Sequence, residues 1–407
     1  MTSRSLDEHR QRVADLLPTM PAIDISLADS HGAMLAADVL AARDIPVHDI
    51  AAHDGYAVRA ADLTGARASS PVTLPVAHDA TFGEHAARRL VPATAVRIAS
   101  GAPVPAGADA VVPLADTDGG VAKVAVRKAS RPGAGIRPRG SELSAGTTVL
   151  RAGTRITARH LAAAASLGLA RLPVHPVPRV VILAVGDELV EPGGRRCGVA
   201  ESSGHLVAAL VKEAGAHAYR IGIVSDDRAA LRSAIEDQLV RADLIITTGG
   251  LSSARNDTVA DVVGSMGAFD VSDFPLLPGG RHGLGHVEAS GRIVPVIGLP
   301  GRPVAAAVAF ESYVRDALRA MSGHLTGTRA TLAATASVSW SSPAGVVQAV
   351  PVLITEGGSV GYTVAPVGDV MAPTVADLAA ANGLVLLPAE VTEIASGTVL
   401  RCISWEA

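Results

Sequence analysis

The chain has 407 residues, more than one hydrophobic core usually supports, so we expect several domains of roughly 100 residues each. Its formal net charge of -4 offers no positive field to a polyanion, which argues against nucleic acid as a partner. The apolar segments are too short to cross a membrane, and Cys197 and Cys402 form no Cys-x-x-Cys pair. We therefore expect a cytoplasmic protein without a membrane span, a disulfide framework or a zinc site.

The first part of the chain predicts a short helix, a small β domain and a second helix. Ser5 followed by Glu8 has the spacing of a capping box, and Pro18 ends the helix that it starts, which we interpret as a packing or dimerisation element. From His53 to about residue 139, short branched runs alternate with turns, which is typical of a separate β domain. Residues 157–167 then have a helical pattern.

A parallel α/β domain is predicted in the middle of the chain. Residues 179–185 and 243–248 are runs of mostly branched apolar residues, and a third strand is expected at 219–224. Helical patterns at 203–213 and 227–240 separate these strands. Strands that alternate with helices predict a mostly parallel sheet covered on both faces, whose ligands bind beyond the carboxyl ends of the strands.

Glycine and polar residues follow two of these strands directly. Gly186, Asp187 and Glu188 follow the first, whereas Gly249, Gly250 and Ser252 follow the second, with Asp257 a little further on. We expect Glu188, Ser252 and Asp257 to face one crevice, where two carboxylates suit magnesium, which prefers oxygen ligands. The alternative interpretation is that Glu188 caps a turn and Asp257 caps the helix predicted at 258–266.

The last part of the chain predicts one long helix and then β structure. Residues 297–303 contain Pro300, Gly301 and Arg302 and open a helix at 304–321, whose bare N–H groups would point at the crevice. From residue 330 onward the pattern is that of a small β domain, with strands expected at 346–354, 360–364, 384–387 and 398–403.

Five motifs in this order resemble those of the molybdopterin molybdenumtransferases, the family of the bacterial MoeA proteins and the gephyrin E domain. The motifs are His53-Asp54-Gly55-Tyr56-Ala57-Val58, residues 97–112, Gly186-Asp187-Glu188-Leu189, Gly249-Gly250-Leu251-Ser252 with Asp257, and residues 298–303. Each motif alone is a weak signal, but five in order over nearly the whole chain are specific.

The resemblance implies a multidomain α/β and β fold. It implies a central three-layer α/β/α domain at 178–325, similar to molybdopterin adenylyltransferase, with a mostly parallel sheet. It also implies a small β domain at 45–142, a discontinuous helical and extended linker domain at 1–44 and 143–177, and a C-terminal domain at 326–407 that resembles a β-barrel.

The activity that the resemblance implies is the insertion of molybdate into adenylylated molybdopterin with release of AMP, dependent on Mg²⁺. The site would be composite in a homodimer, with the central domain of one subunit facing the small β domain of the other. Molybdopterin adenylyltransferase and molybdoenzyme maturation proteins are expected partners. The C-terminal domain could also bind a protein, as in gephyrin.

Family correspondence also assigns roles to particular residues. It gives catalytic roles to Asp54, Glu188 and Asp257, and magnesium to Glu188, Asp257 and Glu201. Asp54 has the alternative interpretation of an Asp-Gly turn. The substrate and nucleotide would be bound by Ser100, Gly186, Asp187, Gly249, Gly250, Ser252, Arg281, Pro300, Gly301 and Arg302.

Several positions depart from the family pattern. Both lysines of a Lys-Pro-Gly-Lys motif are missing from the segment 277–281, where Arg281 is the nearest cation, and Arg302 replaces the asparagine of Gly-Asn-Pro. The three lysines of the chain lie elsewhere, so arginine must supply any cationic contact to phosphate here. The alternative function is therefore a catalytically weakened paralogue that acts as a dimeric, gephyrin-like scaffold for another protein.

Overall fold

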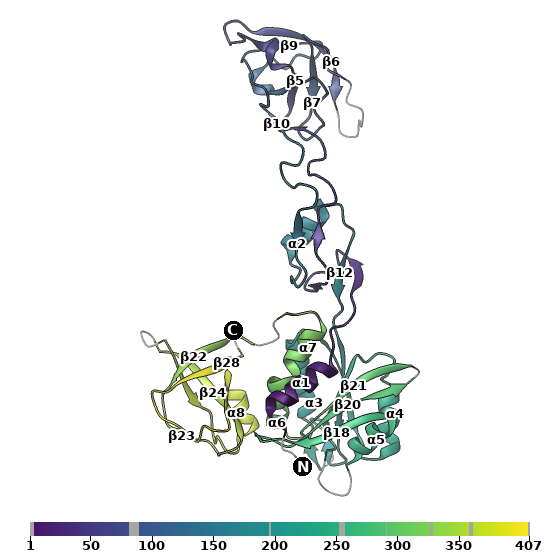
Figure 1. The fold of residues 1–407 in the computed structure, drawn as a ribbon, viewed down its shortest axis with the longest axis vertical. Helices are drawn as coiled ribbons and strands as arrows, with labels where there is room; N and C mark the ends of the chain where they lie inside the picture. The colour runs from purple at the N-terminus through teal and green to yellow at the C-terminus, as the bar shows by residue number, and fades with distance from the viewer. Residues whose placement is uncertain are drawn as a thin grey trace. The chain divides into compact units, whose positions relative to one another are not determined.

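A computed structural model of the chain describes residues 4–80, 89–194, 197–251, 257–289, 291–325, 329–357 and 361–405. The chain forms two compact units (Figure 1). Unit 1 comprises Met1–Ile25, Gly32–Ala36 and Pro173–Ala407, and unit 2 comprises Ser26–His31 and Ala37–Leu172. The finer division into four domains stays a prediction.

Unit 1 is built on a mixed sheet, which in the described residues has six strands in the order β16-β13-β17-β21-β20-β18. The first four strands in this order are parallel to one another, whereas β20 is antiparallel to both of its neighbours, β21 and β18. The bounds are β13 Arg179–Val185, β16 His217–Val224, β17 Leu244–Gly249, β18 Gly267–Asp273, β20 Arg281–Ala289 and β21 Arg292–Leu299. The prediction of a mostly parallel central sheet is confirmed.

The antiparallel strands β18 and β20 were not predicted from the sequence. Their glycines weaken the β-strand signal, but the structure shows why glycine is needed there. A Cβ atom on Gly285 would lie 1.9 Å from the Ala268 carbonyl oxygen, and one on Gly283 would lie 2.2 Å from the ring of Phe269. The close pairing of β18 with β20 therefore depends on residues without side chains.

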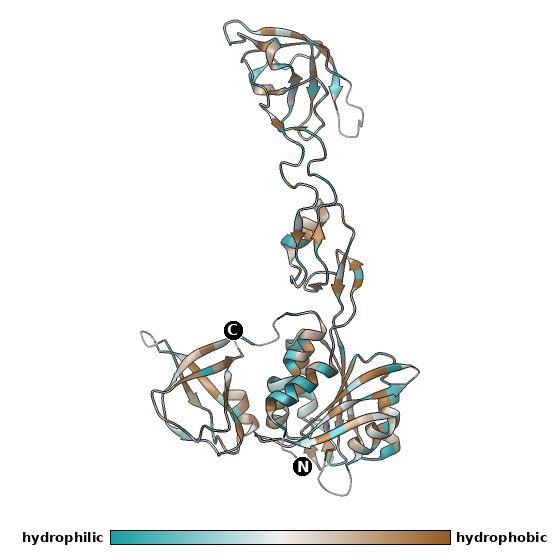
Figure 2. Ribbon diagram, viewed as in Figure 1, coloured by the Kyte–Doolittle hydropathy of each residue, from teal (hydrophilic) through white to brown (hydrophobic). Residues whose placement is uncertain are grey.

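Helices cover both faces of this sheet. The bounds are α1 Leu6–Leu16, α3 Ser203–Glu213, α4 Arg228–Glu236, α5 Thr258–Met266, α6 Pro303–Ala309, the π-helical turn η3 Phe310–Val314 and α7 Arg315–Met321. Successive side chains of a strand point to opposite faces, so β13 supplies two cores. Val180 and Ile182 pack with α3 and α6, while Val181 and Leu183 pack with α4 and α5. Figure 2 shows hydrophobic residues, in brown, along these strands.

Helix α1 packs against the central domain. The Ser5 hydroxyl accepts a hydrogen bond from the Glu8 amide, and the Glu8 carboxylate accepts one from the Ser5 amide, so the predicted capping box is confirmed. Val13 joins the core that contains Phe310. His9 is fully buried, and this burial lowers its pKa to about 3. The packing role of this helix is confirmed, while a role in dimerisation stays a prediction.

The C-terminal part of unit 1 is a β-barrel, as predicted. Within the described residues, the strand order β24-β25-β22-β28-β26 closes through a further pairing of β24 with β26, and β19 extends the sheet beside β24. Val350, Val385 and Cys402 belong to its core. The bounds are β19 Leu276–Leu277, β22 Thr331–Ala336, β23 Trp340–Ser341, β24 Val347–Glu356, β25 Tyr362–Pro366, α8 Val375–Ala380, β26 Gly383–Leu387, β27 Glu393–Ile394 and β28 Val399–Ser404.

Unit 2 contains the predicted small β domain. Its sheet, counted over the described residues, has five strands in the order β8-β5-β7-β6-β9. The bounds are β5 Gly55–Val58, η1 Ala60–Leu63, β6 Val72–Ala80, β7 Ala95–Ile98, β8 Ala110–Pro113, η2 Leu114–Asp116 and β9 Lys123–Val126. Tyr56, Val112 and Val124 meet in its core.

The remaining elements are short. Thr157 is the N-cap of the predicted helix, and Gly168 follows its end with φ of 79°. The bounds are β1 Ile23–Ser26, β2 Met34–Leu35, β3 Val39–Leu40, β4 Ile50–Ala51, β10 Ile136–Arg137, β11 Thr148–Leu150, α2 Ala158–Ser166, β12 Arg171–His175, β14 Leu189–Val190 and β15 Val199–Ala200. No helix in the described part of the chain is long and apolar enough to span a membrane.

Candidate functional site

The carboxyl ends of three parallel strands lie at one edge of the central sheet. Val185 at the end of β13 is in register with Gly249 of β17, and Thr248 of β17 is in register with Leu299 of β21. The loops that begin at Gly186, Gly250 and Pro300 therefore start side by side. This is the edge at which ligands bind in open α/β sheets.

Glycine lets two of these loops approach each other closely. Gly249 has φ of 81°, and a Cβ atom at this position would lie 2.6 Å from the carbonyl oxygen of Val185. A Cβ atom on Gly301 would lie 3.2 Å from the Cα atom of Gly249. The Ser203 hydroxyl donates a 2.7 Å hydrogen bond to the Gly301 carbonyl and so ties the start of α3 to the third loop.

Asp187 and Glu188 have different environments in the first loop. The Asp187 carboxylate accepts hydrogen bonds from the Ser225 hydroxyl at 2.7 Å and from the Asp226 amide at 3.3 Å. Glu188 is exposed, and its carboxylate folds back so that both oxygens would lie 2.7 Å from a Cβ atom on Gly186. Among the described residues no group donates a hydrogen bond to this carboxylate. Asp187 thus shapes the loop, whereas Glu188 remains available to a ligand.

Asp257 and Arg281 form an ion pair at the same edge. The Arg281 guanidinium lies 2.7 Å from the Asp257 carboxylate, and the two side chains are 26% and 18% exposed. Asp257 also accepts a 3.4 Å hydrogen bond from the Ala260 amide as the N-cap of α5, so the helix-capping interpretation is confirmed. Burial raises the pKa of Asp257, although Arg281 acts in the opposite direction.

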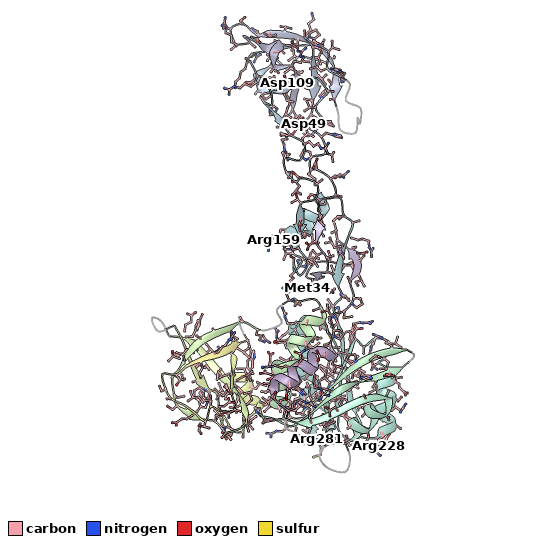
Figure 3. The ribbon with its side chains drawn as sticks, viewed as in Figure 1. Met34, Asp49, Asp109, Arg159, Arg228 and Arg281 are labelled. Carbon is pink, nitrogen blue, oxygen red and sulfur yellow. The ribbon has the colours of Figure 1, made fainter. Side chains whose placement is uncertain are left out.

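The loop before β20 brings Arg281 to this edge. A Cβ atom on Gly280 would lie 3.0 Å from the Pro300 side chain, so the loop packs against the third strand end. Arg302 is exposed at the N-cap of α6, close in sequence to Pro300. Figure 3 labels Arg281 and Arg228 at the same end of unit 1. The structure thus places Asp257, Arg281 and Pro300 near one another, and their roles in binding stay predictions.

Glu201 has a buried environment that the sequence did not reveal. Its side chain is 1% exposed, and it accepts hydrogen bonds from the Gly204 amide at 2.6 Å and from Arg220 at 3.1 Å. Arg220 also contacts both carboxylate oxygens of Glu191, at 2.8 and 2.6 Å. Glu201 therefore accepts a hydrogen bond at the start of α3 and balances the charge of the Arg220 guanidinium. Its role as a metal ligand stays a prediction.

Asp54 and Ser100 come together in unit 2. The Ser100 amide donates a 2.7 Å hydrogen bond to the Asp54 carboxylate, beside a cavity of about 250 Å³ that Asp79 and Arg97 also line. A Cβ atom on Gly55 would lie 1.9 Å from the Val112 carbonyl oxygen. The glycine after Asp54 is thus required by the pairing of β5 with β8.

One predicted site residue lies outside the described residues, and two residues near the site were not predicted. Ser252 lies outside the described residues. In the described ranges no cluster of three or more His, Cys, Asp or Glu side chains forms a ready metal site. Ser225 and Asp226 were missed, although they follow the predicted strand at 219–224 as Gly186 and Asp187 follow theirs. The same rule of polar residues after a parallel strand could have found them.

Comparison with known proteins accounts for nearly the whole chain. Residues 4–168 match the MoeA N-terminal region (domain I and II), residues 181–320 match a probable molybdopterin binding domain, and residues 333–405 match the MoeA C-terminal region (domain IV). Molybdopterin molybdenumtransferase 2 of Mycobacterium tuberculosis is 39% identical over 406 residues, covering 98% of each chain.

Two further proteins extend the comparison. Molybdopterin molybdenumtransferase of Bacillus subtilis is 30% identical over 392 residues, covering 93% of this chain and 89% of its own. The crystal structure of a molybdopterin biosynthesis MoeA protein from Pyrococcus horikoshii superposes with a TM-score of 0.78 and 25% identity, covering 100% of both chains. The chain therefore belongs to the MoeA family of molybdopterin molybdenumtransferases.

Proposed function

We propose that this protein inserts molybdate into adenylylated molybdopterin and releases AMP, in a reaction that requires Mg²⁺. Relatives named molybdopterin molybdenumtransferase support the pathway. The observation that carries the proposal is that the Asp257–Arg281 pair and the Pro300 loop lie at the carboxyl edge of the parallel sheet, where the loop that contains Glu188 also starts. An adenylyltransferase must supply the activated substrate.

Glu188 and Asp257 have the chemistry that a magnesium ion needs. Magnesium is usually bound by one or two carboxylates together with substrate phosphates and water. Glu188 is exposed and accepts no hydrogen bond from the described residues, and Asp257 follows the neighbouring strand. These two residues would hold the ion, which would neutralise charge on the nucleotide phosphate. Glu201 is the less suited third ligand, because its side chain is only 1% exposed, whereas that of Asp257 is 18% exposed, and the Gly204 amide engages it at 2.6 Å.

Arginine and backbone N–H groups would bind the anionic parts of the substrate. Arg302 lies at the start of the helical segment that runs from α6 to α7, where bare N–H groups attract phosphate. Arg281 is the second cation, and each charge-assisted hydrogen bond it makes would contribute about 1.5 to 3 kcal/mol. In this proposal, Arg281 and Arg302 bind the substrate phosphates in place of the missing lysines, and Asp257 orients Arg281.

A homodimer would complete the site. Asp54 and Ser100 lie in unit 2, where Arg97 and Asp79 line the adjoining cavity. We assign Asp54 to the molybdate or dithiolene end of the substrate, reached from the second protomer. The Ser100 amide holds the Asp54 carboxylate, so Asp54 is positioned before substrate arrives.

The test is release of AMP by the purified full-length protein. Incubation with adenylylated molybdopterin, molybdate and Mg²⁺ should release AMP together with formation of molybdenum cofactor. Omission of Mg²⁺ or of molybdate should suppress release. No AMP release from folded protein, under conditions in which the B. subtilis relative is active, would overturn the proposal.

The alternative of a protein-binding scaffold has no specific support. The similar proteins described above are named for the transferase reaction or for molybdopterin biosynthesis. The scaffold is therefore not proposed.

A further inference from the structure

Four buried rings pack together beneath the strand that carries Arg281. We call them the ring cluster, and they belong to His9 in α1, Phe274 after β18, His282 in β20 and Tyr313 in η3. The ring centroid of Phe274 lies 4.3 Å from that of His282 and 4.6 Å from that of His9. The rings of His9 and Tyr313 are 4.5 Å apart. The ring cluster thus joins α1, η3 and the start of β20 inside the core of unit 1.

His282 and Arg281 are neighbours in β20 and point in opposite directions. Successive side chains of a strand lie on opposite faces of the sheet. Arg281 reaches the Asp257 carboxylate at 2.7 Å on the α5 face, while His282 is fully buried in the ring cluster on the other face. The position of the His282 side chain therefore affects the backbone that carries Arg281.

Backbone pairing supports this strand end from one side. Pairing of β20 with β21 begins at Gly283, so among the described strands Arg281 and His282 pair with β18 alone. Gly279 and Gly280 precede them, and glycine gives the backbone conformational freedom. His282 is thus the residue next to Arg281 that anchors the start of β20 in the core.

A hydrogen bond connects His282 to the helical segment that begins after Arg302. The Nδ1 atom of His282 lies 2.8 Å from the hydroxyl oxygen of Tyr313. Tyr313 belongs to the π-helical turn η3, which continues α6, and turns of this kind are frequent at functional sites. The bond therefore connects the two elements that carry Arg281 and Arg302.

A histidine is costly at this buried position. Burial lowers the pKa of His282 to about 4, so its ring is neutral at physiological pH. Its Nε2 atom has no hydrogen-bond partner in the described part of the chain, which costs free energy that an apolar ring would not. A phenylalanine could pack against Phe274 equally well, but it could not bind Tyr313. The bond to Tyr313 is therefore what a histidine adds here.

We propose that His282 is a positioning residue for the reaction proposed above: through its hydrogen bond to Tyr313, it fixes the end of β20 from which Arg281 binds the substrate phosphate. The inference rests on the proposed function, because it requires Arg281 to bind that phosphate. Asp257 holds the guanidinium of Arg281, and His282 holds the adjoining backbone. His282 is fully buried, so it acts through Arg281 and not by contact with the substrate.

Calorimetric titration of the full-length protein with AMP and Mg²⁺ tests this role. His282→Phe and Tyr313→Phe each remove the hydrogen bond and keep a ring, so the Kd for AMP should rise about fivefold in both. The rise should be larger in Arg281→Gln, which loses the phosphate contact itself. His282→Asn places an amide atom near the position of Nδ1, so its Kd should stay within about twofold of the wild type.

Two further measurements separate positioning from stability. A merely structural role would lower the fraction of protein that binds AMP, and thus the stoichiometry, while the Kd stays unchanged. His9→Phe is the matched control, because it replaces the other buried histidine of the ring cluster and should leave the Kd unchanged. Tyr313→Phe added to Arg281→Gln should weaken binding no further, since the hydrogen bond acts through Arg281.

Several results would overturn the inference. Unchanged Kd in His282→Phe and Tyr313→Phe, when Arg281→Gln binds more weakly, refutes the positioning role alone. So does a further loss of affinity when Tyr313→Phe is added to Arg281→Gln. If His282→Phe does not fold, Tyr313→Phe decides.

Failure of the proposed function gives different results. Absence of AMP binding by the wild type, or unchanged Kd in Arg281→Gln, overturns the assigned role of Arg281 and this inference with it. A wild type that binds AMP with the expected variant effects, but releases none from adenylylated molybdopterin, supports the role of His282 in phosphate binding and overturns the proposed reaction.

Discussion

The starts of α3 and α5 each place a carboxylate opposite an arginine, and the two pairs differ in their surroundings. Glu201 at α3 is 1% exposed, accepts a hydrogen bond from the Gly204 amide and faces Arg220. Asp257 at α5 is 18% exposed and makes only a long bond to its own helix. The Glu201–Arg220 pair is therefore structural, whereas the Asp257–Arg281 pair is accessible to a ligand.

Residue type and position after a strand therefore do not separate a structural carboxylate from a binding one. Both carboxylates were predicted to hold magnesium on the basis of the family resemblance. The number of hydrogen bonds that each already accepts, and its burial, make the difference. Four substitutions test this contrast.

Replacement of Glu201 should have the largest effect on stability. Glu201→Ala would leave Arg220 partly buried beside only the exposed Glu191 and would remove the bond to the Gly204 amide, so we expect a loss of about 3 kcal/mol. The measurement is the free energy of unfolding from urea denaturation. A loss below about 1 kcal/mol would mean that this pair is not structural.

Replacement of Glu188 should affect ligand binding while stability is preserved. Glu188→Gln keeps the size of the side chain, and the exposed carboxylate has no donor among the described residues, so stability should change by less than about 0.5 kcal/mol. Binding of AMP with Mg²⁺ should weaken about tenfold or more in calorimetry, because one charged ligand is lost. Equal binding by Glu188→Gln and the wild type would remove Glu188 from the metal site.

The pH dependence of stability should reveal that Arg281 does not fully offset the effect of burial on the charge of Asp257. Because its pKa is raised in the fold, protonated Asp257 favours the folded state, and this contribution is present below the unfolded pKa and lost as pH rises through the folded pKa. Stability of the wild type relative to Asp257→Asn should therefore fall as pH rises from below the ordinary aspartate pKa of about 3.9 towards neutral pH.

Comparing the wild type with Asp257→Asn at each pH cancels the contributions of groups that titrate in both proteins. Burial lowers the pKa of His282 to about 4 and that of His9 to about 3, so both proteins lose stability as pH falls below the ordinary histidine range. A difference between wild type and Asp257→Asn that does not change with pH would contradict the raised pKa of Asp257.

Replacement of Glu191 should have the smallest effect and serves as the control for Glu201. Glu191 is 50% exposed, although Arg220 contacts both of its oxygens. Exposed ion pairs contribute little, so Glu191→Gln should cost less than about 1 kcal/mol in urea denaturation and leave AMP binding unchanged. A cost as large as that of Glu201→Ala would show that the two carboxylates share the structural role.

The sequence predicted much of the site because local rules govern it. The helix at Ser203–Glu213 and the strand at Arg179–Val185 have the predicted bounds, since an amphipathic or fully apolar run is a local property. The glycine loops after the strands were predicted for the same reason. The antiparallel strands β18 and β20 were not, because their glycines are explained only by the neighbouring strand.

Sequence patterns alone predicted the family, the mixed α/β and β architecture, and the edge of the sheet at which polar residues gather. The folded chain was needed to show which carboxylates are engaged: Arg220 engages Glu201, Arg281 engages Asp257, and no described donor engages Glu188. The physical reason is that hydrogen bonding and burial depend on residues distant in the chain, which no local pattern specifies.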